Sequence, residues 1–83
     1  MKLLYFAWLQ SRVGLTGEEV SPPASVATVG DLLDWLKTRS DRHAAAFADA
    51  DRLRAAVNQE FAGLDHPLRA DDEVAFFPPV TGG

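Results

Sequence analysis

The hydrophobic side chains of this 83-residue chain gather in two segments of strand length, one near each end. Residues 2–9 are almost all aliphatic or aromatic, and residues 73–77 form a similar apolar segment after an acidic turn. Alternation divides the first segment into two apolar faces, with Leu3, Tyr5 and Ala7 on one and Leu4, Phe6 and Trp8 on the other. Strands that are apolar on both faces suit central positions, so we expect these two to be neighbours in one sheet.

The middle of the chain predicts one main helix. Thr28 and Asp31 form a capping-box pattern, and leucine and tryptophan residues follow at helical spacing to about Thr38. The alanine-rich segment 44–48 predicts a short second helix. We expect the apolar stripe of the main helix to pack against the sheet.

Shorter elements complete the predicted sheet. Residues 11–17 contain two glycines and predict a turn, and residues 18–26 predict a strand that Pro22-Pro23 confines in part to a sheet edge. A further strand is predicted at 52–57, ending in a turn at Asn58-Gln59. This order predicts an α+β domain, a mixed sheet of about five strands with one main helix packed across it.

Composition and charge narrow the classes of function. A hydrophobic fraction of 47% fits a globular domain, and the net charge of −4 without any run of Lys and Arg argues against a nucleic-acid partner. The chain has no cysteine, which excludes a disulfide, a thiolate metal site and a cysteine nucleophile. Residues 3–9 are too short to span a bilayer and lack a signal-peptide cleavage site. We therefore expect a cytoplasmic protein without a membrane partner.

The C-terminus is the most distinctive candidate for chemistry. Gly82-Gly83 ends the chain in a slender arm without side chains. An extended arm over residues 78–83 reaches roughly 20 Å at about 3.3 Å per residue, and Pro78-Pro79 restrict its base to extended angles. We predict a globular domain at residues 1–77, a flexible arm at 78–83, and a working group in the Gly83 carboxylate.

Other side chains that could carry chemistry give weaker signals. His43 and His66 lie in polar contexts without a Ser, Cys or metal-ligand pattern, so we expect surface or turn roles for both. The acidic residues 71–73 lead into a strand and are interpreted as a solvated turn, and we predict no metal site. In the last strand, Val74 and Phe76 share the predicted core face, which leaves Phe77 outward beside the arm.

The ending DEVAFFPPVTGG, residues 72–83, resembles the small-subunit family of molybdopterin synthase, the sulfur carriers of molybdenum cofactor biosynthesis. The resemblance spans essentially the whole chain. Asp71 stands where the family often has a glycine, and because Asp tolerates left-handed angles we expect that turn to survive. Further matches occur in order at Phe6-Ala7, 28–32, 55–59 and 65–68.

The resemblance implies a ubiquitin-like β-grasp fold and a mechanism. A partner adenylating enzyme uses ATP to activate the Gly83 carboxylate, and sulfur then replaces the adenylate to leave a thiocarboxylate. The arm enters the large subunit of the synthase, where the sulfur passes to cyclic pyranopterin monophosphate. The chain is then a non-catalytic subunit of a sulfurtransferase, without a permanently bound cofactor, in a heterotetramer with two large subunits.

The resemblance also assigns roles to individual residues. The arm that enters the large subunit is formed by Pro78, Pro79, Val80, Thr81 and Gly82, followed by the reactive Gly83. The family presents an apolar partner surface at the positions of Phe6 and Phe61, and ordinary core packing is the alternative for these two residues. For Phe77 the prediction comes from strand alternation, which turns its side chain outward beside the arm, where it would contact the partner.

Two alternatives remain open from the sequence. A sulfur carrier for thiamine or for tRNA thiolation, or a ubiquitin-like modifier, would share the Gly-Gly ending. A passive ubiquitin-like interaction module would share the fold but leave Gly83 without chemistry.

Overall fold

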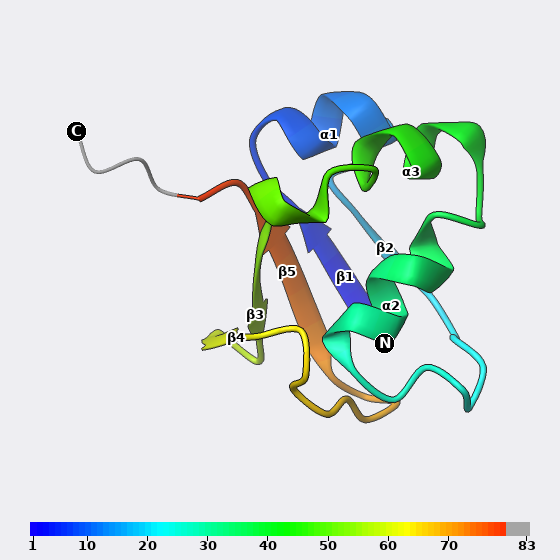
Figure 1. The fold of residues 1–83 in the computed structure, drawn as a ribbon, viewed down its shortest axis with the longest axis vertical. Coiled ribbons are helices and arrows are strands. Elements are labelled where there is room, and N and C mark those ends of the chain that lie inside the picture. The colour runs from blue at the N-terminus through cyan, green and yellow to red at the C-terminus, as the bar shows by residue number, and fades with distance from the viewer. Residues whose placement is uncertain (80–83) are drawn as a thin grey trace.

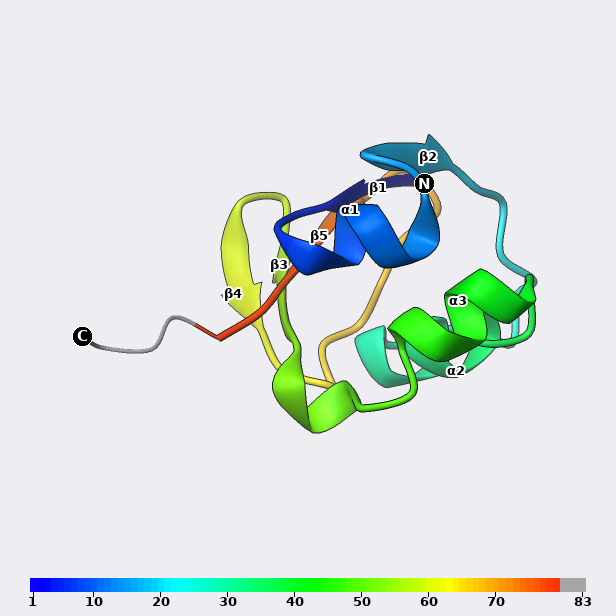
Figure 2. The ribbon, with the colours of Figure 1, turned by 90° about the horizontal axis from the view of Figure 1, so that it is seen from above.

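The computed structural model describes residues 1–79 as a mixed sheet with helices on one side (Figures 1 and 2). The sheet has five strands in the order β2-β1-β5-β3-β4. The strands are β1 (Lys2–Tyr5), β2 (Gly17–Glu19), β3 (Arg54–Val57), β4 (Glu60–Ala62) and β5 (Glu73–Phe77). The helices are α1 (Trp8–Val13), α2 (Val29–Leu36), α3 (Asp41–Ala46) and the 3-10 helix η1 (Ala50–Arg52).

The centre of the sheet is a parallel pair formed by the first and last strands. β1 runs parallel to β5, with Leu3 opposite Val74 and Tyr5 opposite Phe76. β5 is also antiparallel to β3 on its other side. The prediction that the two hydrophobic segments are neighbours is therefore confirmed, and the first and last strands lie together in the middle of the sheet.

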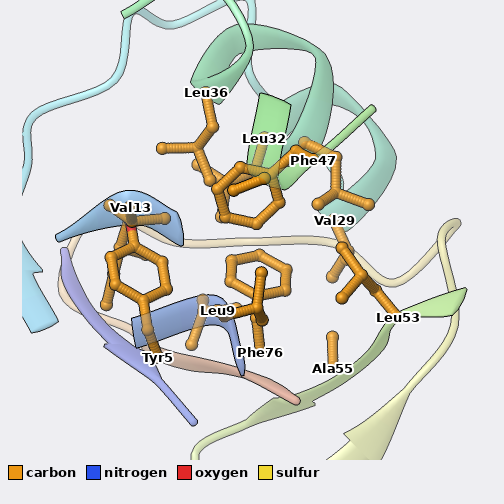
Figure 3. Packing of buried hydrophobic residues seen from close by; sticks show 14 of the residues in the cluster. Tyr5, Leu9, Val13, Val29, Leu32, Leu36, Phe47, Leu53, Ala55 and Phe76 are labelled. Carbon is orange, nitrogen blue, oxygen red and sulfur yellow. The ribbon is translucent and has the colours of Figure 1, made fainter. Parts of the chain in front are cut away.

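The core lies between one face of the sheet and the helices. On β5, Val74 and Phe76 are buried while their neighbours are only half-buried, so the predicted core face of this strand is confirmed. Phe47, just after α3, packs its ring 5.9 Å from that of Tyr5 and 5.4 Å from that of Phe76. In Figure 3 the ring of Phe76 rises from the sheet towards Phe47. α2 contributes Val29, Leu32, Leu33 and Leu36 from above.

The predicted strand at residues 2–9 is wrong beyond Tyr5. Ala7 adopts a positive φ of 57°, which turns the chain off the sheet and into α1. The helix buries Leu9 and Val13, which are one turn apart, and ends at Gly14 with a left-handed φ of 87°. The side chain of Arg42 on α3 donates to two carbonyls in the last turn of α1, at 3.1 Å each. Part of the predicted turn at 11–17 is therefore helix.

The remaining elements differ from their predictions mainly in length. α2 is confirmed, and its capping box forms as expected, with the Thr28 hydroxyl accepting from the Asp31 amide. α3 begins earlier than predicted because Ser40 caps it by accepting from the amide of His43. The predicted strand at 18–26 is reduced to β2, and the predicted strand at 52–57 to β3, because η1 occupies its start.

His43 is buried, so the surface or turn role predicted for it is wrong. Only 8% of the residue is exposed, and its Nε2 donates to Glu18 Oε2 at 2.7 Å. The Tyr5 hydroxyl donates to the same oxygen at 2.7 Å, while the Ser40 hydroxyl lies 2.7 Å from His43 Nδ1. Arg39 places its guanidinium 3.8 Å from the other Glu18 oxygen. This network ties the edge strand β2 to α3 and to the central strand β1.

The network shifts the pKa values of two of its members in opposite directions. Burial raises the pKa of Tyr5 far above its usual range, helped by its hydrogen bond to the Glu18 carboxylate. Burial alone would also raise the pKa of Glu18, but the hydrogen bonds from His43 and Tyr5 and the nearby Arg39 hold it below its ordinary value. Glu18 is therefore ionised in the folded protein at neutral pH, and its protonation makes the network sensitive to acid.

Asp72 is also buried, with 8% exposure, which corrects the interpretation of residues 71–73 as a solvated turn. Its carboxylate accepts from the Arg69 amide at 2.7 Å and from the Asn58 side chain at 2.9 Å. These bonds hold the pKa of Asp72 below its usual range, with the Arg69 amide as the largest cause. Asn58 in turn accepts from the Glu73 amide at 3.1 Å, so the β3–β4 turn is fastened to the start of β5.

Replacing Glu18 by Gln should reveal the acid sensitivity of the network. A carboxyl whose folded pKa is lowered stabilises the protein above its unfolded pKa, and this stabilisation is lost as the pH falls through the folded pKa. We expect Glu18→Gln to lower the free energy of unfolding by about 1–2 kcal/mol at neutral pH, and by much less near pH 3, measured by urea denaturation. Glu60→Gln, at an exposed position on β4, is the control and should match the wild type at both pH values. A deficit of Glu18→Gln that is constant with pH would contradict the assignment.

Candidate functional site at the base of the arm

The last strand delivers the chain to one corner of the sheet. β5 ends at Phe77, and Pro78 and Pro79 follow as half-buried residues without regular structure. Proline has no amide hydrogen to donate to a neighbouring strand, so the sheet pairing ends here. The end of β1 lies alongside, because the Phe6 amide donates to the Phe76 carbonyl at 3.1 Å. Pro78 and Pro79 therefore continue the chain from a corner between the end of β1 and the start of β3.

The sheet face opposite the core is apolar around this corner. Strand register places Leu4, Ala75, Ala56 and Phe61 opposite one another in a single row across four strands. Alternation puts Phe77 on the same face, and Phe6 follows Leu4 at the end of β1. We call this surface the open-face patch, formed by Leu4, Phe6, Ala56, Phe61, Ala75 and Phe77.

Two of the three predicted partner-binding aromatics are strongly exposed. Phe61 is 84% exposed and Phe6 is 45% exposed, while Phe77 is half-buried with its ring 5.9 Å from that of Phe61. The outward direction predicted for Phe77 agrees with the burial pattern of β5. Exposed aromatic side chains that gather on one face indicate an interaction site. The structure thus brings all three predicted residues to the same side of the sheet.

Ala56 and Ala75 are members of the patch that the sequence does not single out, and Leu4 is predicted only as part of an apolar face. Alanines on a strand are common both in cores and on surfaces, so their presence in the sequence does not indicate a binding site. Their register shows that they form a shallow floor between Leu4 and Phe61. The β3–β4 turn at Asn58-Gln59, with positive φ at both residues, holds the second strand of the hairpin in place.

The predicted reactive group itself lies outside the residues that the structure describes. The structure describes residues 1–79, so the predicted arm residues Val80, Thr81, Gly82 and Gly83 are not among them. Within residues 1–79, no three His, Cys, Asp or Glu side chains gather closely enough to hold a metal ion. Over the same residues, no helix has the length and apolarity to cross a membrane.

Replacing each of the two phenylalanines of β5 by alanine should show which one faces the core and which one lies on the open face. Phe76→Ala removes a fully buried ring and is expected to lower the free energy of unfolding by about 3–5 kcal/mol, a large share of the stability of a domain of this size. Phe77→Ala should remain folded, with the far-ultraviolet circular dichroism of the wild type and a clear cooperative thermal transition. Unfolding of Phe77→Ala, or a stable Phe76→Ala, would show that the two faces are assigned the wrong way round.

Comparisons with known proteins show the family of the chain. Residues 3–83 match the ThiS family. The molybdopterin synthase sulfur carrier subunit of Escherichia coli is 48% identical over 83 residues, covering all of this chain and 99% of that protein. The protein of the same name from Haemophilus influenzae is 31% identical over the same length, again covering 99% of its chain.

Solved structures show the same fold. The crystal structure of small archaeal modifier protein 1 from Haloferax volcanii superimposes with a TM-score of 0.76 at 34% identity, covering 100% of this chain and 98% of that one. A putative molybdopterin converting factor, subunit 1, from Pyrococcus furiosus gives a TM-score of 0.76 at 33% identity, with 95% of each chain covered. The predicted ubiquitin-like α+β fold is therefore confirmed.

Proposed function

The chain belongs to the ThiS family, and on that premise we propose that it is the sulfur carrier subunit of a molybdopterin synthase. The observation that carries the proposal is the position of the open-face patch, directly beside the base of an arm that ends in Gly-Gly. A partner that binds this patch receives the arm at the same time. The full-length similarity to sulfur carrier subunits, over all 83 residues, supports the same function.

The carboxylate of Gly83 needs activation before it can carry sulfur. One of its oxygens attacks the α-phosphorus of ATP on an adenylating enzyme and displaces pyrophosphate, which gives an acyl-adenylate. A sulfur nucleophile then attacks the acyl carbon and AMP leaves, so that Gly83 ends in a thiocarboxylate. Because the chain has no cysteine, no thiol side chain competes for the sulfur.

In the large subunit the thiocarboxylate sulfur attacks a carbon of cyclic pyranopterin monophosphate and displaces an oxygen substituent from that carbon, which leaves Gly83 joined to the precursor through a thioester. Water then cleaves the bond between the acyl carbon and the transferred sulfur, and the Gly83 carboxylate is regenerated. A dithiolene contains two sulfurs, so two loaded carriers are consumed for each product. The arm brings no acid or base, and these groups come from the large subunit.

The domain positions the arm and does not take part in the chemistry. At roughly 20 Å, the extended arm reaches a neighbouring active site while the globular part stays outside. Pro78 and Pro79 restrict the base of the arm, which reduces the entropy lost on insertion. The open-face patch supplies the binding energy for the large subunit, in a heterotetramer with a central dimer of large subunits.

Loading of the carrier is tested by intact mass spectrometry after incubation with its cognate ATP-dependent adenylating enzyme, ATP and a sulfur source. We expect the mass to rise by the difference between one sulfur and one oxygen atom, at the C-terminal residue only. A chain with one residue appended after Gly83 is the control and should not change in mass. A carrier whose mass never shifts with its cognate enzyme would contradict the mechanism.

Binding to the large subunit is tested by truncating the open-face patch. Phe61→Ala and Phe77→Ala should each weaken the affinity for the large subunit by about tenfold or more, measured by isothermal titration calorimetry, because exposed aromatics become buried anchors. Leu64→Ala is the matched control, since Leu64 is 58% exposed but lies after β4, outside the patch. Equal losses for all three variants would place the interface elsewhere.

A second function is favoured by one relative. Small archaeal modifier protein 1 of Haloferax volcanii is 40% identical over 62 residues, covering 69% of this chain and 71% of that protein. If this chain acts as a modifier, its Gly83 forms isopeptide bonds with lysine side chains of other proteins. Conjugates recovered from cells under denaturing conditions would favour this alternative, whereas a free thiocarboxylate favours the carrier.

A further inference from the structure

One row of side chains crosses the open face of the sheet from edge to edge. Strand register gives its members in order as Gly17, Leu4, Ala75, Ala56 and Phe61. The row starts at a residue without a side chain and ends at a strongly exposed aromatic, since 84% of Phe61 is accessible. Leu4 and Phe61 are therefore the two projections of the row, and its other three positions are shallow.

This row fits its own reverse. When it is laid over a second copy in the opposite order, Phe61 meets Gly17, Leu4 meets Ala56, and Ala75 meets its own copy at the centre. A two-fold axis along β5 produces this reversal when two sheets pack face to face. Packed sheets keep their strands within about 30° of each other and lie about 10 Å apart, with interdigitating side chains. Every large side chain of the row then faces a small one.

The glycine end of the row is hollowed. A hollow of about 450 Å³ adjoins Gly17 and is lined mainly by residues of β1 and β2, among them Lys2 and Leu4. A Cβ at position 17 would lie 2.6 Å from the Leu3 carbonyl oxygen, so the pairing of β1 with β2 requires a residue without a side chain here. The Phe61 ring of a second copy would be buried in this hollow, which removes an exposed aromatic surface from water.

The rows on either side of this one set the strength of the pairing. Towards the arm, Arg54 lies opposite Phe77, and Phe6 lies at the end of β1. Reversal about β5 brings the Arg54 side chain of one copy to the Phe6 ring of the other, a contact of a cation with an aromatic face. On the other side, Glu73 lies opposite Lys2 and approaches its own copy, which is a like-charge contact. The first contact stabilises the pairing and the second weakens it.

From this self-complementary face we infer that the free carrier forms a two-fold dimer with a second copy of itself through the open-face patch. The patch is formed by a handful of residues, compared with about 20–30 on each side of a stable interface, so the dimer exchanges readily with the monomer. Because the axis runs along the strands, both β5 strands end on the same side of the dimer. The dimer covers the surface that binds the large subunit, so the two partners compete, and this consequence alone rests on the proposed function.

Sedimentation equilibrium of the full chain, without any partner, tests the dimer directly. We expect the average molar mass to rise from that of the monomer towards that of the dimer between about 10 μM and 1 mM, the range of weak interfaces. One equivalent of the large subunit should replace the dimer by the complex. A carrier that stays monomeric at about 1 mM would overturn the inference, whereas a carrier that dimerises but does not bind the large subunit would overturn the proposed function.

Exchanging a large and a small side chain tests the register of the dimer. Ala56→Leu brings two leucines into contact and Leu4→Ala leaves a gap, so each variant alone should dimerise about tenfold more weakly than the wild type. In an equimolar mixture the two variants should form a heterodimer with nearly the wild-type affinity, because each large side chain again faces a small one. Far-ultraviolet circular dichroism checks that both variants are folded. A mixture that associates no better than the separate variants would overturn the inference.

Glu73→Gln tests the direction of the axis and leaves the apolar row intact. It removes the like-charge contact, so the dimer should tighten by about threefold, and most at low salt. Glu60→Gln changes the net charge equally and is the control, since Glu60 precedes Phe61 on β4 and alternation turns its side chain to the other face. Dimerisation of Glu73→Gln that is no tighter than that of Glu60→Gln would contradict an axis along β5 and overturn the inference.

Discussion

The parallel pairing of β1 with β5 is the contact on which the rest of the molecule depends. It joins segments about 70 residues apart, so folding must close nearly the whole chain before this contact forms. The pair buries Leu3, Tyr5, Val74 and Phe76 against the helices. Because the strands are parallel, the same pairing brings the end of β1 beside the point where the arm leaves β5. The register of β1 against β5 therefore determines the core, the open-face patch and the point from which the arm leaves the sheet.

A domain of this size buries only a small hydrophobic core, and its polar networks connect elements at the edges of the sheet. Glu18 and His43 fasten the short edge strand β2 to α3, and the Asn58–Asp72 pair fastens the β3–β4 turn to β5. Both networks leave the opposite sheet face uncovered. The residues that stabilise the domain through these networks are thus different from those that form the open-face patch, which allows the patch to remain apolar.

The sequence predicts this fold best where local chemistry and tertiary packing agree. The capping box at Thr28 and the hydrophobic run of β5 are local signals, and the structure follows both. α1 could not be predicted because residues 2–9 form a continuous apolar run, which is typical of a strand. The turn at Ala7 has a positive φ, but no glycine marks it in the sequence. The burial of His43 depends on Glu18, 25 positions earlier, and so leaves no local pattern. Of the candidate site, the sequence indicates the aromatics, whereas the alanine floor between them requires the strand register.

We propose that Gly83, at the end of the arm, delivers the sulfur while the open-face patch binds the large subunit. This proposal is tested most directly by preparing the thiocarboxylate chemically, from an intein-derived thioester, and mixing it with the large subunit and cyclic pyranopterin monophosphate. We predict that the chain ending in a Gly83 thiocarboxylate forms dithiolene product. A chain shortened by Gly83, with its thiocarboxylate on Gly82, should react at least about 100-fold more slowly because its sulfur is misplaced. Equal rates from the two chains would contradict the account.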